Sequence, residues 1–190
     1  MIPKNIFTIW ISEKDLPEKY KKWCKTHEIA AYNHYYITLK DCIKINSNYL
    51  RECLKSKHWV KATDYVRMHY LYNKGGIYLD CDMKVLKPFD DLLSNSLFLG
   101  REDANIIANS IIGAESKHPL IKKYLELVEN NFKGSGDMIF EPAERLLTDL
   151  ILEKYGKFGK TTTYSSDYFF PTEDNNKNSY TFHNFIRSWK

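Results

Sequence analysis

Two carboxylates stand one residue apart near the middle of the 190-residue chain, at Asp80 and Asp82. They follow the sequence GGIYL at residues 75–79, whose apolar part predicts a strand. Residues i and i+2 of a strand point to the same face, so the two carboxylates are expected to lie about 6–7 Å apart along it. Two like charges at that separation favour a nearby cation or a raised pKa. The pair therefore predicts a metal site or acid–base chemistry.

The segment before this strand carries a second pair of charges. Residues 59–73 have apolar positions at helical spacing, and two glycines end the segment. Asp64 and Arg67 are three positions apart on this predicted helix and are neighbours on its surface. Their spacing alone favours an ordinary intrahelical ion pair. The alternative is a site shared with Asp80, in which the arginine binds a phosphate.

Aromatic side chains are dense at the end of the chain, at Phe182, Phe185 and Trp189. Such a tail is expected to dock against the rest of the protein rather than fray. His183 lies within it, and a lone histidine is more often structural than a ligand. Trp10 and Trp189 are core residues by default, although aromatic faces also stack on bases and sugars.

Strand and helix patterns alternate through the first two thirds of the chain, which predicts a single α/β domain over residues 1–190. The carboxylate pair would then lie at the carboxyl end of a strand, where open α/β sheets bind ligands. A polar run at residues 173–179 predicts a mobile surface loop. Strands are expected at residues 6–11, 35–38, 77–80, 83–86, 97–100, 110–114 and 180–183, and helices at 17–27, 59–73, 120–132 and 142–155.

Composition excludes several classes of protein. Lys and Arg number 28 against 24 Asp and Glu, and this net charge of +4 is too small for a nucleic-acid-binding surface. The four cysteines have neither CxxC nor zinc spacing, so a reduced, cytoplasmic location is expected. The start of the sequence lacks the pattern of a signal peptide and no apolar run reaches membrane-spanning length, so neither a signal peptide nor a transmembrane segment is expected. The basic segment 18–25 would allow peripheral contact with the inner face of a membrane, although a solvated helix face is the simpler interpretation.

Four segments together resemble the glycosyltransferases with a DXD sugar-binding region. That group includes the yeast-type initiating α-mannosyltransferases and bacterial capsule-synthesis transferases, with the glucosylating domains of clostridial toxins as more distant relatives. The segments are IPKNIFTIW at 2–10, KATDYVRMHYLYNKGGIYLDCDMKVLKPFDDLL at 61–93, IIANSIIGAESKHPLI at 106–121 and TFHNFIRSW at 181–189.

The resemblance implies a GT-A fold, with a central mixed, mostly parallel sheet flanked by helices. It also implies a nucleotide-sugar donor, a divalent metal and retention of the anomeric configuration. Mn²⁺ is the first candidate for the metal and Mg²⁺ the second; a UDP-sugar is the first candidate for the donor and GDP-mannose the second. The implied reaction is transfer to a saccharide or glycoconjugate acceptor in bacterial surface-polysaccharide synthesis. Front-face attack and a covalent intermediate both remain open.

The same resemblance implies roles for individual residues. Asp82 matches the direct metal ligand, and His183 matches a further ligand that joins when the tail closes. Asp80 matches the carboxylate that holds the donor ribose or sugar and a metal-bound water, and Arg67 adds a positive field, so Asp80, Asp82 and Arg67 are the expected catalytic residues. Further residues match donor-binding positions that stack on the base, hold the sugar and phosphate, or close over the diphosphate. These residues are Trp10, Asp64, Arg67, Tyr78, Asp80, Asn109, Ser188 and Trp189.

Two positions depart from the pattern of this family. Phe7 stands where many members have a histidine, and Asn184 stands where many have a second histidine after His183. Neither change removes a carboxylate, so the expected metal site is intact.

Other interpretations of the carboxylate pair are weighed against this one. A haloacid-dehalogenase-type phosphatase also has Asp-x-Asp after an apolar strand, but that strand is the first of its fold, whereas this pair lies in mid-chain. A glycosidase is weaker, because neighbouring residues of one strand rarely flank a substrate. The alternative from another class is a non-catalytic nucleotide-sugar-binding module, and the two intact aspartates argue against it.

Overall fold

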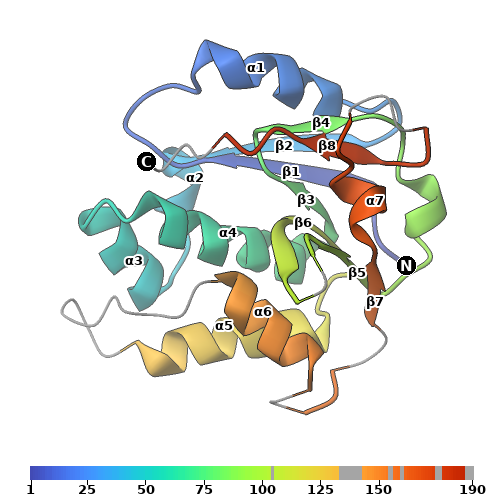
Figure 1. Ribbon diagram of the computed structural model, residues 1–190. Coiled ribbons are helices and arrows are strands. Elements are labelled where there is room, and N and C mark those ends of the chain that lie inside the picture. The colour runs from blue at the N-terminus through green and yellow to red at the C-terminus, as the bar shows by residue number, and fades with distance from the viewer. Residues whose placement is uncertain (104, 133–142, 154–155, 159–160, 174–176, 187–190) are drawn as a thin grey trace.

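A six-stranded sheet with the strand order β2–β1–β3–β6–β5–β7 forms the centre of the protein (Figure 1). The computed structural model describes residues 1–103, 105–132, 143–153, 156–158, 161–173 and 177–186. Strand β6 runs antiparallel to both of its neighbours, whereas the other pairs are parallel, so the sheet is mixed and mostly parallel. The strands are β1 (Asn5–Trp10), β2 (Asn33–Thr38), β3 (Gly76–Leu79), β5 (Leu97–Arg101), β6 (Ile107–Ala114) and β7 (Thr161–Tyr164).

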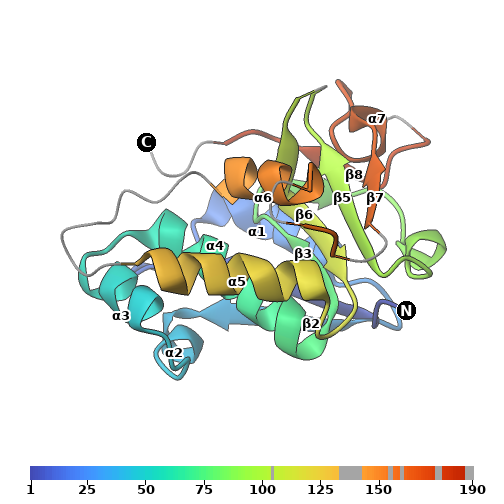
Figure 2. The same ribbon diagram turned by 90° about the horizontal axis from the view of Figure 1, so that it is seen from below.

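Helices and a small second sheet cover the two faces of this sheet (Figures 1 and 2). One face packs against α3 (Asn48–Lys55), α4 (Trp59–Lys74), α5 (Pro119–Asn131) and α6 (Ala143–Ile151). Over the other face lie α1 (Glu18–Cys24) and the antiparallel pair β4 (Met83–Val85) and β8 (Thr181–His183). The short elements that complete the described fold are the 3-10 turns Lys25–His27 and Asp90–Leu92 and the helices α2 (Leu39–Cys42) and α7 (Ser166–Phe169).

Alternating side chains of the central strands divide the core into two layers. Ile6 and Ile77 belong to the cluster beneath β4 and β8, whereas Phe7 and Tyr78, their neighbours in sequence, belong to the cluster beneath α4. Phe7 is fully buried and its ring stacks on Tyr35 with centroids 5.3 Å apart. Phe7, where the resemblance led us to note a departure from histidine, is therefore a core residue.

Two glycines let α4 turn directly into β3. Gly75 has φ of 65° and Gly76 has φ of 134°, both in the region that favours glycine. A Cβ at Gly76 would lie 2.5 Å from the carbonyl oxygen of Asn5 on β1. The close approach of β1 and β3 therefore depends on these glycines, and it brings the segment after β3 beside the end of β1.

Most of the predicted elements are present, with ends that differ by a few residues. The predicted strand at 110–114 begins earlier, at Ile107, and residue 142 and residues 154–155 of the last predicted helix lie outside the described residues, as do residues 174–176 of the predicted loop. The prediction omitted α2, α3, β7 and α7. The α3 helix does have a local signal, because the Ser47 hydroxyl accepts a hydrogen bond from the amide of Leu50 as an N-cap.

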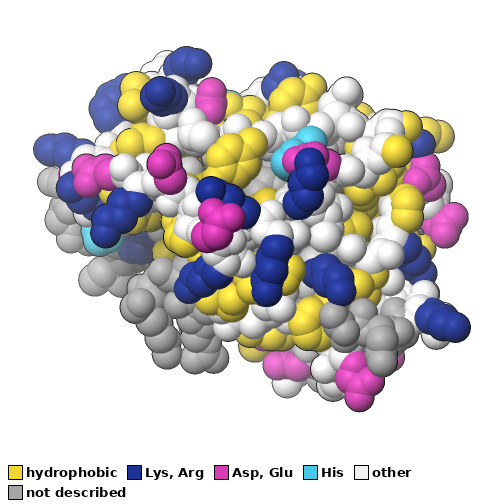
Figure 3. Space-filling view, turned by 90° about the horizontal axis from the view of Figure 1, so that it is seen from above, with side chains coloured by type: hydrophobic (Ala, Val, Ile, Leu, Met, Phe, Trp, Pro, Cys, Tyr) yellow, Lys and Arg dark blue, Asp and Glu magenta, His cyan; other side chains and the backbone are white. Residues whose placement is uncertain are grey.

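Basic side chains of α1 do not form a patch of one sign. Lys21 pairs with Glu18 at 2.7 Å and Lys25 pairs with Glu28 at 2.5 Å. Figure 3 shows this side of the molecule, where Lys and Arg side chains are spread among acidic and hydrophobic ones. Among the described residues, no helix is both long and apolar enough to cross a membrane.

Candidate active site

The two carboxylates of the DXD motif lie in a tight turn between two strands. Strand β3 ends at Leu79, and the amide of Met83 donates to the carbonyl of Asp80 at 3.1 Å, so the chain reverses before β4 begins. The prediction that Asp80 and Asp82 share one face of a strand is therefore wrong. Aspartate is common in such turns, and pairing of β4 with β8 requires the reversal.

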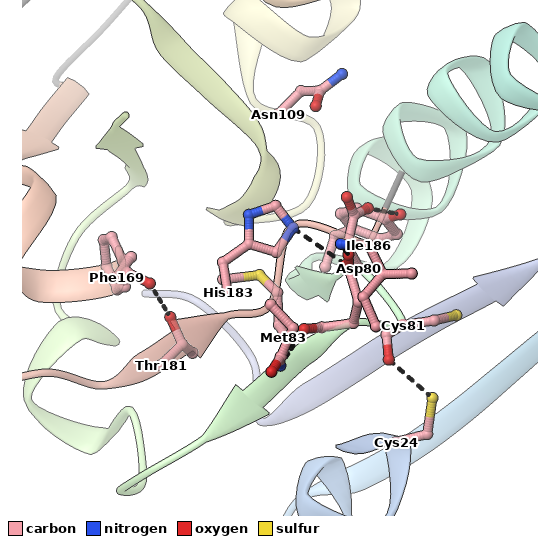
Figure 4. A network of polar contacts seen from close by, with 12 residues as sticks. Cys24, Asp80, Cys81, Met83, Asn109, Phe169, Thr181, His183 and Ile186 are labelled. Atoms are coloured by element: carbon pink, nitrogen blue, oxygen red, sulfur yellow. Dashed lines mark hydrogen bonds and ion pairs between the residues drawn. The ribbon is translucent and has the colours of Figure 1, made fainter. Parts of the chain in front are cut away.

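His183 from β8 joins the two aspartates to form a three-residue cluster. Asp80, Asp82 and His183 each offer one ligand atom, and these atoms lie within 4.8 Å of one another. Nε2 of His183 lies 3.1 Å from Oδ1 of Asp82. In Figure 4 the imidazole points from β8 toward the turn that holds Asp80. Residues 101 positions apart thus meet because β4 and β8 pair.

Asp82 also holds the segment that follows β8. The amide of Ile186 donates to Oδ2 of Asp82 at 2.8 Å, and the side-chain amide of Asn184 donates to the Asp82 carbonyl at 2.7 Å. Asn184, the second position noted as a departure from histidine, therefore anchors the segment after β8 to the DXD turn. Ser188 and Trp189, which the resemblance places at the diphosphate, lie outside the described residues.

Arg67 of α4 is the centre of a buried polar network behind the turn. Its guanidinium lies 2.9 Å from Oδ1 of Asp64 and 3.7 Å from Oδ1 of Asp80, and it covers the Tyr78 ring at 4.4 Å from the centroid. The Tyr78 hydroxyl donates to the same oxygen of Asp80. Arg67 therefore contacts the DXD motif as well as its helical neighbour Asp64.

Asn109 on β6 extends this network on the side away from the tail. Its carbonyl accepts from Nη1 of Arg67 at 2.5 Å, and its side-chain amide donates to Oδ1 of Asp64 at 3.2 Å. Asn109 and Asp64 do not border the pocket described below. Their contacts support Arg67, and any contact with a donor stays a prediction.

Burial dominates the electrostatics of these groups. It raises the pKa of Asp64 to about 7 although Arg67 acts in the opposite direction. Burial also raises the pKa of Asp80, again against Arg67, with the charge of Asp82 adding to the rise. For His183, burial lowers the pKa, but the hydrogen bond and charge of Asp82 outweigh it and the net shift is upward.

The cluster fits a divalent metal ion. Two carboxylates and an imidazole with ligand atoms within 4.8 Å of one another are a mixed oxygen and nitrogen donor set of the kind that binds divalent ions. Nε2 of His183 donates to the Asp82 carboxylate, so a metal ion bound at Nε2 would require the proton to lie on Nδ1, which is buried and has no hydrogen-bond partner in the described part of the chain. Asp82 and His183 would hold the ion, with Asp80 beside them.

A pocket of about 620 Å³ opens from the DXD turn along the ends of β1 and β3. Trp10, Arg67, Tyr78, Asp80 and Asp82 border it, as the sequence-based interpretation expects of a shared site. This volume lies within the usual range of small-molecule sites, about 300–1,000 Å³. The pocket lies at the carboxyl ends of parallel strands, the usual ligand position in open α/β sheets.

One face of α4 forms a pocket wall that the sequence analysis missed. Trp59, Thr63 and Arg67 all border the pocket and follow one another at four-residue spacing. Residues four apart lie on the same helix face, so this spacing was a signal that could have extended the site toward the helix start. Tyr20 of α1 and Ile186 complete the opposite side.

Comparison with known sequences identifies the central region. Residues 12–99 match the family described as the glycosyltransferase sugar-binding region containing a DXD motif. The initiation-specific alpha-1,6-mannosyltransferase of Candida albicans is 34% identical over 106 residues, which cover 50% of this chain and 28% of the relative. An uncharacterised glycosyltransferase of Acanthamoeba polyphaga mimivirus is 28% identical over 177 residues, covering 87% of this chain and 70% of the relative. The chain thus spans little more than a quarter of the fungal enzyme.

Comparison with solved structures identifies the fold. The PaToxG glycosyltransferase matches 80% of this chain and 70% of its own, with a TM-score of 0.63 and 22% sequence identity. The mixed sheet with helices on its faces is the GT-A fold. These matched proteins are glycosyltransferases by name, and none of them is named as a phosphatase or a glycosidase.

Proposed function

Because the chain belongs to the glycosyltransferases whose sugar-binding region contains a DXD motif, we propose that it transfers a hexose from a nucleoside-diphosphate sugar in a metal-dependent reaction. The observation that carries the proposal is the convergence of Asp80, Asp82 and His183 beside a pocket of about 620 Å³ that also contains Trp10. A non-catalytic binding module would have no need of a three-residue ligand set.

Each residue of the pocket has a part in this proposal. Trp10 at the end of β1 would stack on the base, and Arg67, whose Nε has no partner among the described residues, would contact a phosphate or sugar oxygen. Asp82 and His183 would hold the metal, and Asp80 would bind the donor. The bound ion would neutralise the negative charge that develops on the leaving diphosphate.

The names of the relatives favour mannose as the sugar. Two relatives in Schizosaccharomyces pombe are inositol phosphoceramide mannosyltransferases, and the Candida albicans relative is also a mannosyltransferase. We therefore place GDP-mannose before the UDP-sugars that the sequence alone put first. The acceptor is proposed to be a saccharide or glycoconjugate, as in surface-polysaccharide synthesis, and Mn²⁺ is proposed as the metal with Mg²⁺ as the second choice.

Retention of configuration, a single domain over residues 1–190 and a cytoplasmic location remain parts of the proposal. Retention by front-face attack follows from the family resemblance, and the anomeric coupling in the NMR spectrum of the product tests it. All four cysteines are free thiols, which suits a reducing compartment. Peripheral membrane contact has little support from α1, whose lysines are partly paired with acidic residues.

The deciding experiment measures release of free nucleoside diphosphate from a panel of nucleotide sugars, with Mn²⁺ and with a chelator. We expect turnover of at least one donor only when metal is present. Asp82→Asn should lower that turnover at least about a hundredfold, because the site loses a charged ligand. Asp90→Asn is the matched control, since Asp90 pairs with Lys4 outside the pocket. Nucleotide binding without turnover of any donor would instead support the non-catalytic module.

A further inference from the structure

Two cysteines meet directly beneath the DXD turn. Cys24 is the last residue of α1, and Cys81 stands between the two aspartates. The Cys24 thiol donates to the carbonyl oxygen of Cys81 at 3.6 Å, and both cysteines belong to one small cluster of buried residues. Figure 4 shows Cys24 reaching from α1 toward Cys81. Residues 57 positions apart thus meet at the site.

This contact distinguishes the pair from the other two cysteines. Cys42 and Cys53 are buried in the large core cluster beneath α4, whereas Cys24 and Cys81 form a small cluster with Tyr20. Cys81 borders the pocket and is 8% exposed, so a small molecule that enters the pocket comes close to this residue. Neither thiol has a part in the proposed transfer reaction.

We propose that Cys24 and Cys81 form a reversible disulfide that controls the DXD turn, with hydrogen peroxide as the oxidant. One thiolate attacks a peroxide oxygen, the O–O bond breaks, and a sulfenic acid and one water result. The second thiol attacks the sulfenic sulfur, the S–S bond forms, and a second water leaves. The two thiols lose two electrons in all, and peroxide is reduced to two waters. A dithiol reductant reverses the reaction by thiol–disulfide exchange.

A disulfide here would move the site itself. The S–S bond is about 2.05 Å long, much shorter than the contact between two thiols, so Cys81 must shift toward α1. Cys81 is bonded directly to Asp80 and Asp82, and its thiol also donates to the Ile9 carbonyl at 3.3 Å. A shift of about 1 Å at a catalytic group can cost about a hundredfold in rate. The reduced form is therefore the active one, which rests on the proposed function.

The first test needs no activity. The native, metal-free protein is oxidised with peroxide, alkylated and digested with trypsin without reduction. We expect a disulfide between the peptides WCK (23–25) and GGIYLDCDMK (75–84), which dithiothreitol removes. The link should be absent in Cys24→Ser and Cys24→Ala, two variants that guard against a folding defect in either one. Cys53→Ser is the matched control and should keep the link.

The second test compares donor turnover before oxidation, after oxidation and after reduction. We expect the oxidised wild type to lose at least about tenfold in rate and to recover with dithiothreitol, while Cys24→Ser keeps its rate throughout. Sulfinic acids without the link, or links that involve only Cys42 or Cys53, would overturn the proposal. A disulfide link that leaves donor turnover unchanged would refute the proposal that the disulfide controls the DXD turn. Absence of turnover in the reduced wild type would instead refute the proposed function. The disulfide-linked peptides would still show whether Cys24 and Cys81 form a disulfide.

Discussion

Removal of one partner of the buried ion pair between Arg67 and Asp64 is predicted to destabilise the fold more than removal of a partner from an exposed pair. The side chains of Arg67 and Asp64 are only 5% and 15% exposed, and their charged atoms lie 2.9 Å apart. At an effective dielectric constant of about 20, the Coulomb attraction over that distance is about 6 kcal/mol. Arg67 also lies 3.7 Å from Asp80, which adds about 4 kcal/mol on the same scale. Desolvation offsets much of this attraction, so the measurable effect is the cost of leaving a partner unpaired.

A double-mutant cycle measures that cost. Arg67→Met should lower the free energy of unfolding by about 3–5 kcal/mol, because it leaves two carboxylates without their cation. Asp64→Asn should cost less, because Arg67 keeps Asp80 as a partner. The double variant should lose at least about 2 kcal/mol less than the sum of the single variants. The assay is urea unfolding of metal-free protein at pH 8.5, above the pKa of about 7 that burial gives Asp64, followed by circular dichroism.

An exposed pair with the same spacing provides the control. Lys21 and Glu18 are also three positions apart and lie 2.7 Å apart, but their side chains are 55% and 85% exposed. Lys21→Met should therefore leave the free energy of unfolding nearly unchanged. If Arg67→Met costs as little as this control, or if the cycle is additive within about 0.5 kcal/mol, the argument from burial is refuted.

Two further predictions concern stability. Burial lowers the pKa of His27 from 6.5 to about 4. Between these two pH values only the unfolded chain readily binds a proton at this residue. The free energy of unfolding should therefore be highest above pH 6.5 and fall by about 3 kcal/mol as the pH drops to 4. Urea unfolding across this range should show a smaller slope for His27→Gln and an unchanged slope for the exposed His58→Gln; equal slopes in all three proteins would contradict the assignment. Gly76→Ala should lower stability by about 3 kcal/mol in the same assay, because its Cβ would meet the Asn5 carbonyl oxygen at 2.5 Å. Gly156→Ala, with positive φ but no atom nearer than 3.9 Å, should cost about 1–2 kcal/mol, and an equal loss in both variants would show that backbone strain alone is responsible.

Local patterns predicted most of the central fold. The alternation around β1 and β3, the helical spacing of α4 and the two glycines between them are short-range signals, and the structure has all three nearly where they were expected. Strand β7 was missed because Thr161–Tyr164 is a short edge strand whose partner, β5, lies about sixty residues earlier in the chain. A pairing over that separation leaves no periodic trace in the sequence near β7.

The residues of the site were predicted better than their geometry. Arg67, Asp80 and Asp82 stand close together in sequence, and the structure brings them to one pocket. The distance between the two carboxylates followed from an assumed strand and was wrong, because the chain turns after Leu79 so that β4 can pair with β8. Thr63 was missed although its four-residue spacing from Arg67 was visible in the sequence.

The sequence by itself determined which chemical groups are available and which of them are neighbours along one element. It determined that Gly75 and Gly76 end α4, that Asp64 and Arg67 share a helix surface, and that two carboxylates follow β3. Only the tertiary structure decided that His183 contacts Asp82, that Arg67 reaches past Asp64 to Asp80, and that Cys24 lies against Cys81. Side-chain periodicity acts over a few residues, whereas these contacts depend on strand pairing and helix packing between segments far apart in the chain.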